Sequence, residues 1–265
     1  MYIMDRHNGS KINQLLIAWP KGTVALYSFL NRAGVTRQLA SVYQRGHWIK
    51  RIGPGAFMRA DDKDVSWAGG LYALQQYDNL SIHTGGITAL EHLGFAHTIH
   101  TGGNNHVILY GNPNEKLPSW FSKYAWPGNV QVYYYPTNLF HAGIKDGIKE
   151  KELNGCNVLI SSAERAIMET LYSLPKHSTF AEIKLLMEGL NALRPEIVQK
   201  LLEKCNSIKV KRLFMVLAEL FNHEWVKHLN LRKVNFGRGK RMTVRNGVLN
   251  NKYNITVPGE YSIEK

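Results

Sequence analysis

Four polar side chains near residue 36 have the types and spacing that could read DNA bases. They are Thr36, Arg37, Gln38 and Ser41. An arginine can donate two hydrogen bonds to O6 and N7 of guanine, and a glutamine can pair with N6 and N7 of adenine. In a helix-turn-helix, the second helix enters the major groove and its early residues meet the base edges. Because these residues begin an expected helix, we predict that they contact bases.

The surrounding segment carries positive charge that suits the DNA backbone. Residues 1–60 contain nine lysines and arginines against a single acid, Asp5. Phosphate or minor-groove contacts are expected from a second set of residues: Lys21, Arg45, His47, Lys50, Arg51 and Arg59. The alternative is a protein-binding unit whose basic face is only solvated, and negligible DNA affinity at low salt would favour it.

The elements expected to position these side chains are those of a winged helix-turn-helix. Apolar spacing and turn residues predict a helix over 11–19, a second over 24–30 capped by Thr23, a third capped by Thr36, and strands over 48–52 and 56–59. The turn Gly53-Pro54-Gly55 joins the two strands. We assign residues 1–65 to this DNA-binding domain, because residues 61–64 form a polar break.

The remaining residues, 66–265, are predicted to form a larger mixed α/β domain, which makes the whole chain α+β. Its expected helices cover residues 67–76, 87–93, 163–173, 180–192, 195–205 and 210–220. Its expected strands cover residues 106–110, 130–135 and 157–161, with others around Val244 and Ile255. Ser161 or Ser162 is expected to cap the helix that begins at Ala163.

Composition limits the class of protein. A chain of 265 residues with 44% hydrophobic and 20% charged residues is that of a folded globular protein. No apolar run approaches the ~18 residues of a membrane span, and residues 5–8 interrupt any signal peptide. Two cysteines, Cys156 and Cys205, are expected to be buried free thiols. We therefore expect a cytoplasmic protein with no membrane partner.

A second basic block lies near the end of the chain. Residues 204–252 carry twelve lysines and arginines against two acids, whereas residues 61–203 carry eleven against fifteen. We predict a second surface, through which the protein acts on another partner, formed by Lys209, Lys211, Arg212, Arg238, Lys240 and Arg241. The turn 237–241 could hold a phosphate through its amides and cations. A solvated face and an extended DNA footprint remain alternatives.

Metal and catalytic patterns are weak. Five histidines, His83, His92, His97, His100 and His106, fall within 24 residues, but their spacing is irregular and no cysteine lies near, so no metal site is predicted. The triplet Glu182-Ile183-Lys184 imitates part of a nuclease signature without a partner aspartate, and favours an ordinary helix pair. Glu164 and Arg165, in the first turn of a helix, also favour a structural role. We predict no cofactor and no enzyme activity.

Several ordered blocks of the chain carry a resemblance to a known family. They are residues 81–97 (SIHTGGITALEHLGFAH), 107–111 (VILYG), 117–121 (LPSWF), 161–169 (SSAERAIME), 193–195 (LRP), 209–214 (KVKRLF) and 237–241 (GRGKR). They resemble the AbiEi antitoxins of bacterial abortive-infection systems, which are type IV toxin–antitoxin systems, and the resemblance covers roughly residues 10–260.

The resemblance implies a bacterial protein with two roles. The amino-terminal winged helix would repress the protein's own operon by binding inverted repeats in double-stranded operator DNA. The carboxy-terminal domain would counteract a nucleotidyltransferase-like toxin encoded beside it, without needing a stable complex. An enzyme of nucleic-acid processing, such as a nuclease guided by its winged helix, is the alternative, and DNA cleavage with and without magnesium distinguishes the two.

Overall fold

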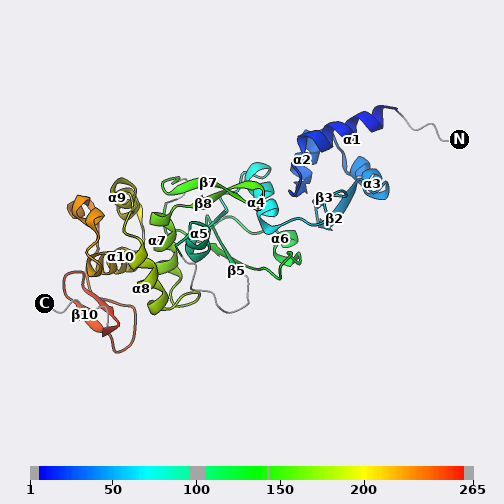
Figure 1. Ribbon diagram of the computed structural model, residues 1–265. Helices are drawn as coiled ribbons and strands as arrows, with labels where there is room; N and C mark the ends of the chain where they lie inside the picture. Colours follow the sequence, from blue (N-terminus) through cyan, green and yellow to red (C-terminus); the bar gives the residue numbers. More distant parts are fainter. Residues whose placement is uncertain (1–5, 96–105, 142–143, 260–265) are drawn as a thin grey trace.

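The computed structural model describes residues 6–95, 106–141 and 144–259 of the chain. Figure 1 shows an elongated molecule in which three groups of elements follow one another: N-terminal helices with a small sheet, a central sheet, and C-terminal helices with another small sheet. The described residues form three separate sheets among helices. The predicted α+β class, a smaller N-terminal unit followed by a larger mixed part, is confirmed.

The N-terminal unit contains three helices and a three-stranded antiparallel sheet of order β1-β3-β2. Its elements are α1 (Arg6–Ala18), β1 (Ala25–Leu26), α2 (Tyr27–Arg32), α3 (Arg37–Arg45), β2 (Ile49–Gly53) and β3 (Ala56–Arg59). The expected helices and hairpin are present. The cap at Thr23 was wrong, because residues 25–26 enter the sheet and the Thr23 hydroxyl donates to the Pro20 carbonyl at 2.7 Å.

Successive side chains of a strand point to opposite sides, so these strands supply residues to both faces of the small sheet. Both faces are buried. One face packs with α1 to α3 through Ala25, Ile49, Phe57, Leu15, Trp19 and Leu30. The other packs with the middle of the chain through Leu26, Ala56, Met58, Trp67, Leu71 and Trp120. A cut after residue 65 would therefore expose the second face, and the domain boundary there stays a prediction.

The central sheet has five strands in the order β6-β5-β4-β8-β7. They are β4 (His83–Thr84), β5 (His106–Gly111), β6 (Gln131–Pro136), β7 (Ile148–Leu153) and β8 (Cys156–Ser161). One face packs with α4 (Trp67–Gln76) and α6 (Ser119–Lys123), the other with α5 (Gly86–His92) and α7 (Ala163–Ser173). Strands β4 and β7 and helix α6 were not predicted.

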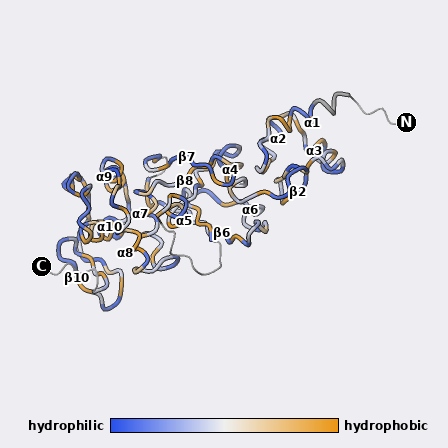
Figure 2. The backbone as a smooth tube through the Cα atoms, in the orientation of Figure 1, coloured by the Kyte–Doolittle hydropathy of each residue, from blue (hydrophilic) through white to orange (hydrophobic). Residues whose placement is uncertain are grey.

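The C-terminal part stacks three helices beside α7 and ends in a small sheet of order β10-β11-β9. Its elements are α8 (Phe180–Gly189), α9 (Pro195–Lys204), α10 (Ile208–Leu220), η1 (Glu224–His228), η2 (Leu231–Lys233), β9 (Arg241–Met242), β10 (Val248–Asn250) and β11 (Ile255–Val257). Figure 2 shows hydrophobic stretches along α7, α8 and α10, where these helices share one core. The strand expected around Val244 is absent from that position.

No helix within the described ranges combines the length and the apolar character that a membrane crossing requires.

Candidate functional site

Helix α3 presents the predicted base-reading residues on one exposed face. Its cap is confirmed: the Thr36 hydroxyl accepts a hydrogen bond from the Leu39 amide at 3.2 Å. Ala40 and Tyr43 are buried against the N-terminal core. Because those two residues fix the inward face, the outward face carries Arg37, Gln38, Ser41, Val42 and Arg45, all of them exposed.

Local contacts hold part of this face in place. The Arg37 guanidinium lies 5.3 Å from the centre of the Tyr27 ring, and Ser41 donates its hydroxyl to the Arg37 carbonyl at 3.0 Å. Two apolar side chains also lie exposed here, Val42 at 44% and Trp48 at 48% exposure, although Val42 belongs to the apolar spacing that predicts the helix. Large apolar side chains that are exposed together on a small unit indicate a contact surface.

The hairpin beyond α3 is packed at its tip and open along its edge. A Cβ on Gly53 would lie 2.6 Å from the Trp120 Cβ, so the turn rests directly on α6. Lys50 and Arg51 are exposed neighbours on the edge strand β2 and point to opposite sides of it. His47 is exposed, with a left-handed backbone (φ 56°), where the chain leaves α3.

Arg59 does not suit the phosphate contact predicted for it. It is 8% exposed, and its guanidinium donates to the carbonyls of Leu16 and Trp19, both at 2.9 Å. It also pairs with Asp61 at 3.0 Å. Arg59 thus holds carbonyls at the end of α1 and is a structural residue.

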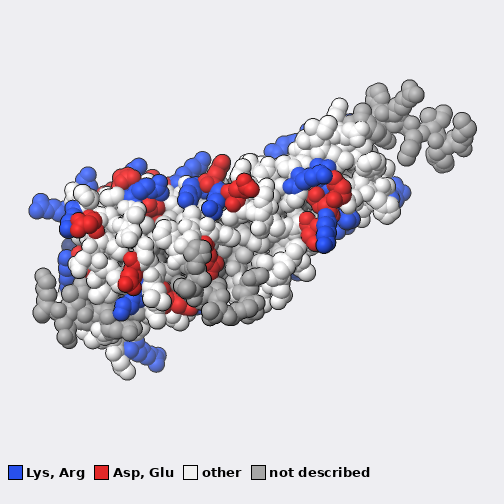
Figure 3. Space-filling view, in the orientation of Figure 1, with Lys and Arg blue, Asp and Glu red and all other residues white. Residues whose placement is uncertain are grey.

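Lys21 is exposed, but its charge is shared with an acid. Its ammonium lies 3.3 Å from the Asp61 carboxylate, whose pKa is lowered by its hydrogen bond to Arg59. In Figure 3, red acidic atoms lie directly beside blue basic atoms over the N-terminal unit. This partly neutral border separates the acid-free segment 6–60 from the rest of the chain.

The predicted second basic surface is wrong in two of its residues. Lys211 and Arg212 are each 3% exposed, because α10 is buried on every side from Val210 to Ala218 and lies inside the core. The Arg212 guanidinium donates to four carbonyls, those of Phe236, Gly237, Gly239 and Asn254, at 2.6 to 3.2 Å. Burial lowers the pKa of Lys211.

The other four cations of the predicted second surface also differ in their exposure. Lys209 is half-buried and donates to the Leu174 carbonyl at 3.4 Å. Arg238, Lys240 and Arg241 are exposed in and beside the turn that Arg212 anchors. Between residues 225 and 259 the sequence holds eight lysines and arginines and no acid, so this end of the molecule is strongly basic. Figure 3 shows basic side chains projecting from it.

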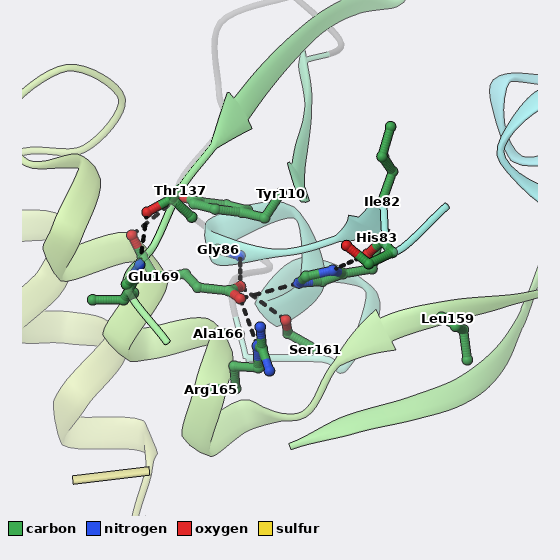
Figure 4. Close-up of polar contacts among 12 residues, drawn as sticks. Ile82, His83, Gly86, Tyr110, Thr137, Leu159, Ser161, Arg165, Ala166 and Glu169 are labelled. Atoms are coloured by element: carbon green, nitrogen blue, oxygen red, sulfur yellow. Dashed lines mark hydrogen bonds and ion pairs between the residues drawn. The ribbon is translucent and has the colours of Figure 1, made fainter. Parts of the chain in front are cut away.

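A buried carboxylate ties the centre of the molecule together (Figure 4). Glu169 of α7 accepts hydrogen bonds from Arg165 Nε at 2.9 Å and His83 Nε2 at 3.1 Å on one oxygen. Its other oxygen accepts from the Gly86 amide at 3.0 Å and the Ser161 hydroxyl at 2.8 Å. Burial alone raises the pKa of Glu169, but hydrogen bonds and charge from His83 and Arg165 outweigh it and hold the pKa at about 2.

The Gly-Gly pair before α5 is explained by this carboxylate. A Cβ on Gly85 would lie 2.3 Å from a Glu169 oxygen, so only glycine allows the close approach. Gly86 then adopts a left-handed backbone (φ 55°) that turns its amide toward the carboxylate. The sequence spacing of residues 85 and 169 does not predict this contact.

Glu164 and Arg165 are neighbours in sequence with different partners. Glu164 pairs with Arg194 at 2.9 Å and accepts a hydrogen bond from Ser162. Burial raises the pKa of Glu164, but the bonds from Arg194 and Ser162 prevail and lower it to about 2. The Ser162 hydroxyl is thus used by Glu164 and does not cap α7, although Ser162 stands at the cap position. Both charged residues have the structural role that the sequence favoured.

The metal and nuclease patterns find no support among the described residues. In that part of the chain no group of three His, Cys, Asp or Glu side chains is placed to hold a metal ion. His97 and His100 lie outside the described residues. Glu182 accepts a hydrogen bond from the Thr179 amide and so completes a capping box at the start of α8. Glu182 therefore has a helix-capping role.

Comparison with known proteins identifies the chain. A family model described as "Transcriptional regulator, AbiEi antitoxin N-terminal domain" matches residues 8–101, and one described as "Transcriptional regulator, AbiEi antitoxin, Type IV TA system" matches residues 104–258. None of the curated proteins compared with the chain matches it.

Among solved structures, the chain is similar to the crystal structure of the RV2827C protein from Mycobacterium tuberculosis. The two are 15% identical and align with a TM-score of 0.60 over 94% of this chain and 90% of that one. At this identity the likeness concerns the fold alone. The family models cover nearly all of the chain, and they show that it belongs to the AbiEi antitoxins, the transcriptional regulators of type IV toxin–antitoxin systems.

Proposed function

We propose that the N-terminal unit is a winged helix-turn-helix that represses the protein's own operon by binding operator DNA. The observation that carries the proposal is the outward face of α3, where five exposed side chains include two arginines and no acid. A helix entering the major groove needs such a face, with cations for guanine and phosphate and small polar groups for other bases.

The proposed contacts follow from exposure. Base contacts are assigned to Arg37, Gln38 and Ser41, with Val42 placed to meet a thymine methyl group. Thr36 keeps its predicted base contact at the start of α3, and phosphate contacts are assigned to Arg45, His47, Lys50 and Arg51. Arg59 is excluded because its guanidinium is used internally, and Lys21 is secondary because Asp61 shares its charge. An operator with inverted repeats would place one α3 in each half-site.

We further propose that the C-terminal part provides the antitoxin activity, counteracting a nucleotidyltransferase-like toxin in the cytoplasm without a stable complex. Arg238, Lys240 and Arg241 support it, because they are exposed on a turn fixed by Arg212 at the end of the molecule remote from α3 (Figure 1). The protein would act without catalysis of its own. Purified protein that cleaves DNA only when magnesium is present would contradict this part.

The test separates the two roles by point variants of the full chain, since truncation would expose the second face of the β1-β3-β2 sheet. Arg37→Ala should relieve repression of a reporter driven by the protein's own promoter and still rescue cells from the toxin encoded beside it. Charge reversal at Arg238 and Lys240 should do the opposite. If both variants lose both activities while remaining folded, the assignment of separate surfaces fails.

A further inference from the structure

A cavity of about 510 Å³ opens beside the buried carboxylate Glu169. It lies on the α7 side of the central sheet, where β4, β5 and β8 meet the segment that leads into β7. His83, Tyr110, Arg165 and Glu169 form its buried floor. Neither the proposed DNA contact nor the basic C-terminal turn uses this cavity.

The single carboxylate of the floor is compensated by its neighbours. The His83 ring faces an acceptor on both sides, the Ser81 carbonyl at 2.9 Å from Nδ1 and a Glu169 oxygen at 3.1 Å from Nε2. The Arg165 guanidinium pairs with the Glu169 carboxylate, whose two oxygens already receive four hydrogen bonds, so the negative charge of the floor is compensated.

The rim adds two lysines, Lys145 on an anchored loop and Lys149 in strand β7. Arg165 Nη1 donates to the carbonyls on either side of Lys145, those of Ile144 at 3.1 Å and Asp146 at 3.2 Å. The Asp146 carboxylate in turn pairs with Lys204 at 2.7 Å. These two attachments fix the backbone that carries Lys145 over the cavity mouth. A ligand would therefore lose little affinity to the ordering of this loop.

Lysine charge at the mouth exceeds carboxylate charge. Lys145 and Lys149 are exposed there, and neither forms an ion pair with any residue that the structure describes. Partial burial, with the nearby Lys151 and Arg194, lowers the pKa of Lys149. Glu150 is the one carboxylate on the described rim. An anion would therefore find unneutralised positive charge.

The walls between rim and floor are apolar. They are formed by Leu80, Phe140, Ile144, Ile148 and Leu159. A mostly apolar cavity with a few convergent polar groups is the usual form of a small-molecule site. We propose that this cavity binds a small organic anion, with its carboxylate or phosphate between Lys145 and Lys149 and its apolar body against Phe140 and Leu159.

A matched pair of fluorescent probes tests the charge and the place of binding. 1-Anilinonaphthalene-8-sulfonate carries an apolar body and an anionic group, and N-phenyl-1-naphthylamine has the same body without charge. On the full-length protein we expect saturable binding of the anion, at least fivefold tighter than the neutral probe. Benzoate and phenyl phosphate should displace it, and whichever competes better identifies the preferred anionic group.

Variants locate the probe. Lys145→Gln combined with Lys149→Gln should weaken the anionic probe at least fivefold and leave the neutral probe unchanged, while Leu80→Trp should weaken both by filling the cavity. Lys123→Gln, an exposed lysine on α6 away from the cavity, is the control and should change neither. Equal affinity for the two probes, no displacement by either competitor, or unchanged affinity in the folded rim variant would overturn the proposal.

Discussion

Two basic regions of this chain place their cations in opposite ways. In α3 the arginines lie outside, because Ala40 and Tyr43, with the partly buried Leu39, face the core. In α10 the cations Lys211 and Arg212 lie inside, because apolar residues surround the helix. The number of positive charges in a segment therefore says little about its surface. The apolar spacing of the element that carries the charges decides whether they meet solvent.

Because Arg212 is buried, we expect that removing its side chain lowers the stability of the fold more than removing an exposed cation does. Arg212→Ala should lower the free energy of unfolding by about 3 kcal/mol or more, because buried carbonyls lose a charged donor. Arg238→Ala, its exposed neighbour in the same region, should change it by less than about 0.5 kcal/mol. Urea denaturation measures both values. Equal losses for the two variants would remove the distinction between the inner and outer cations.

A second test extends the rule to the buried carboxylate Glu169, which pairs with the buried cation Arg165. The pKa of Glu169 falls from an ordinary 4.5 to about 2 in the folded protein, so its stabilising effect is present above pH 4.5 and disappears as pH falls toward 2. Glu169→Gln should therefore lower stability near pH 7 by about 3 kcal/mol. Thermal unfolding from pH 7 to pH 3 should show the deficit shrinking, and a deficit independent of pH would refute the charge argument.

For the exposed cations of α3, the effect of a substitution should appear in DNA binding. Arg37→Ala should weaken operator binding by about 1–3 kcal/mol and relax the preference at one base position. Arg37→Lys should recover affinity without the preference, because a lysine cannot make the two parallel hydrogen bonds. Fluorescence anisotropy with a set of mutated operators measures both. An unchanged preference would move α3 out of the groove.

The smallest effects are expected from the edge strand. Lys50→Ala and Arg51→Ala should each weaken specific and non-specific DNA alike and flatten the salt dependence by about one unit. Arg59→Ala is the matched control, since its side chain holds α1 and should alter stability without altering the salt slope. A slope reduced by Arg59→Ala, in protein shown to be folded, would return that residue to the interface.

Much of the N-terminal unit could be predicted because its spacing is local. The cap at Thr36, the break at Gly34 and the turn 53–55 each determine structure within a few residues. Strand β7 was missed because its lysines and glutamates are poor strand formers. The Asn154-Gly155 pair that follows it, with φ of 50° and 78°, is a hairpin turn and could have revealed it.

The centre of the molecule could not be predicted in the same way. His83, Gly85 and Glu169 meet across more than eighty positions, and no local pattern links them. The misplacement of Lys211 and Arg212 has a different cause, since the apolar run that follows them was visible. A charge count over residues 204–252 takes no account of this apolar run. The helical pattern of residues 208–220 would have predicted that Lys211 and Arg212 are buried.

The most direct test of the central claim is a map of guanine N7 protection on duplex DNA from upstream of the protein's own gene. N7 lies in the major groove, where α3 is proposed to bind. The account predicts that the wild-type protein protects guanines in two repeated half-sites and that Arg37→Ala loses protection at one guanine of each. Identical protection by both proteins, or binding without any N7 protection, would contradict it.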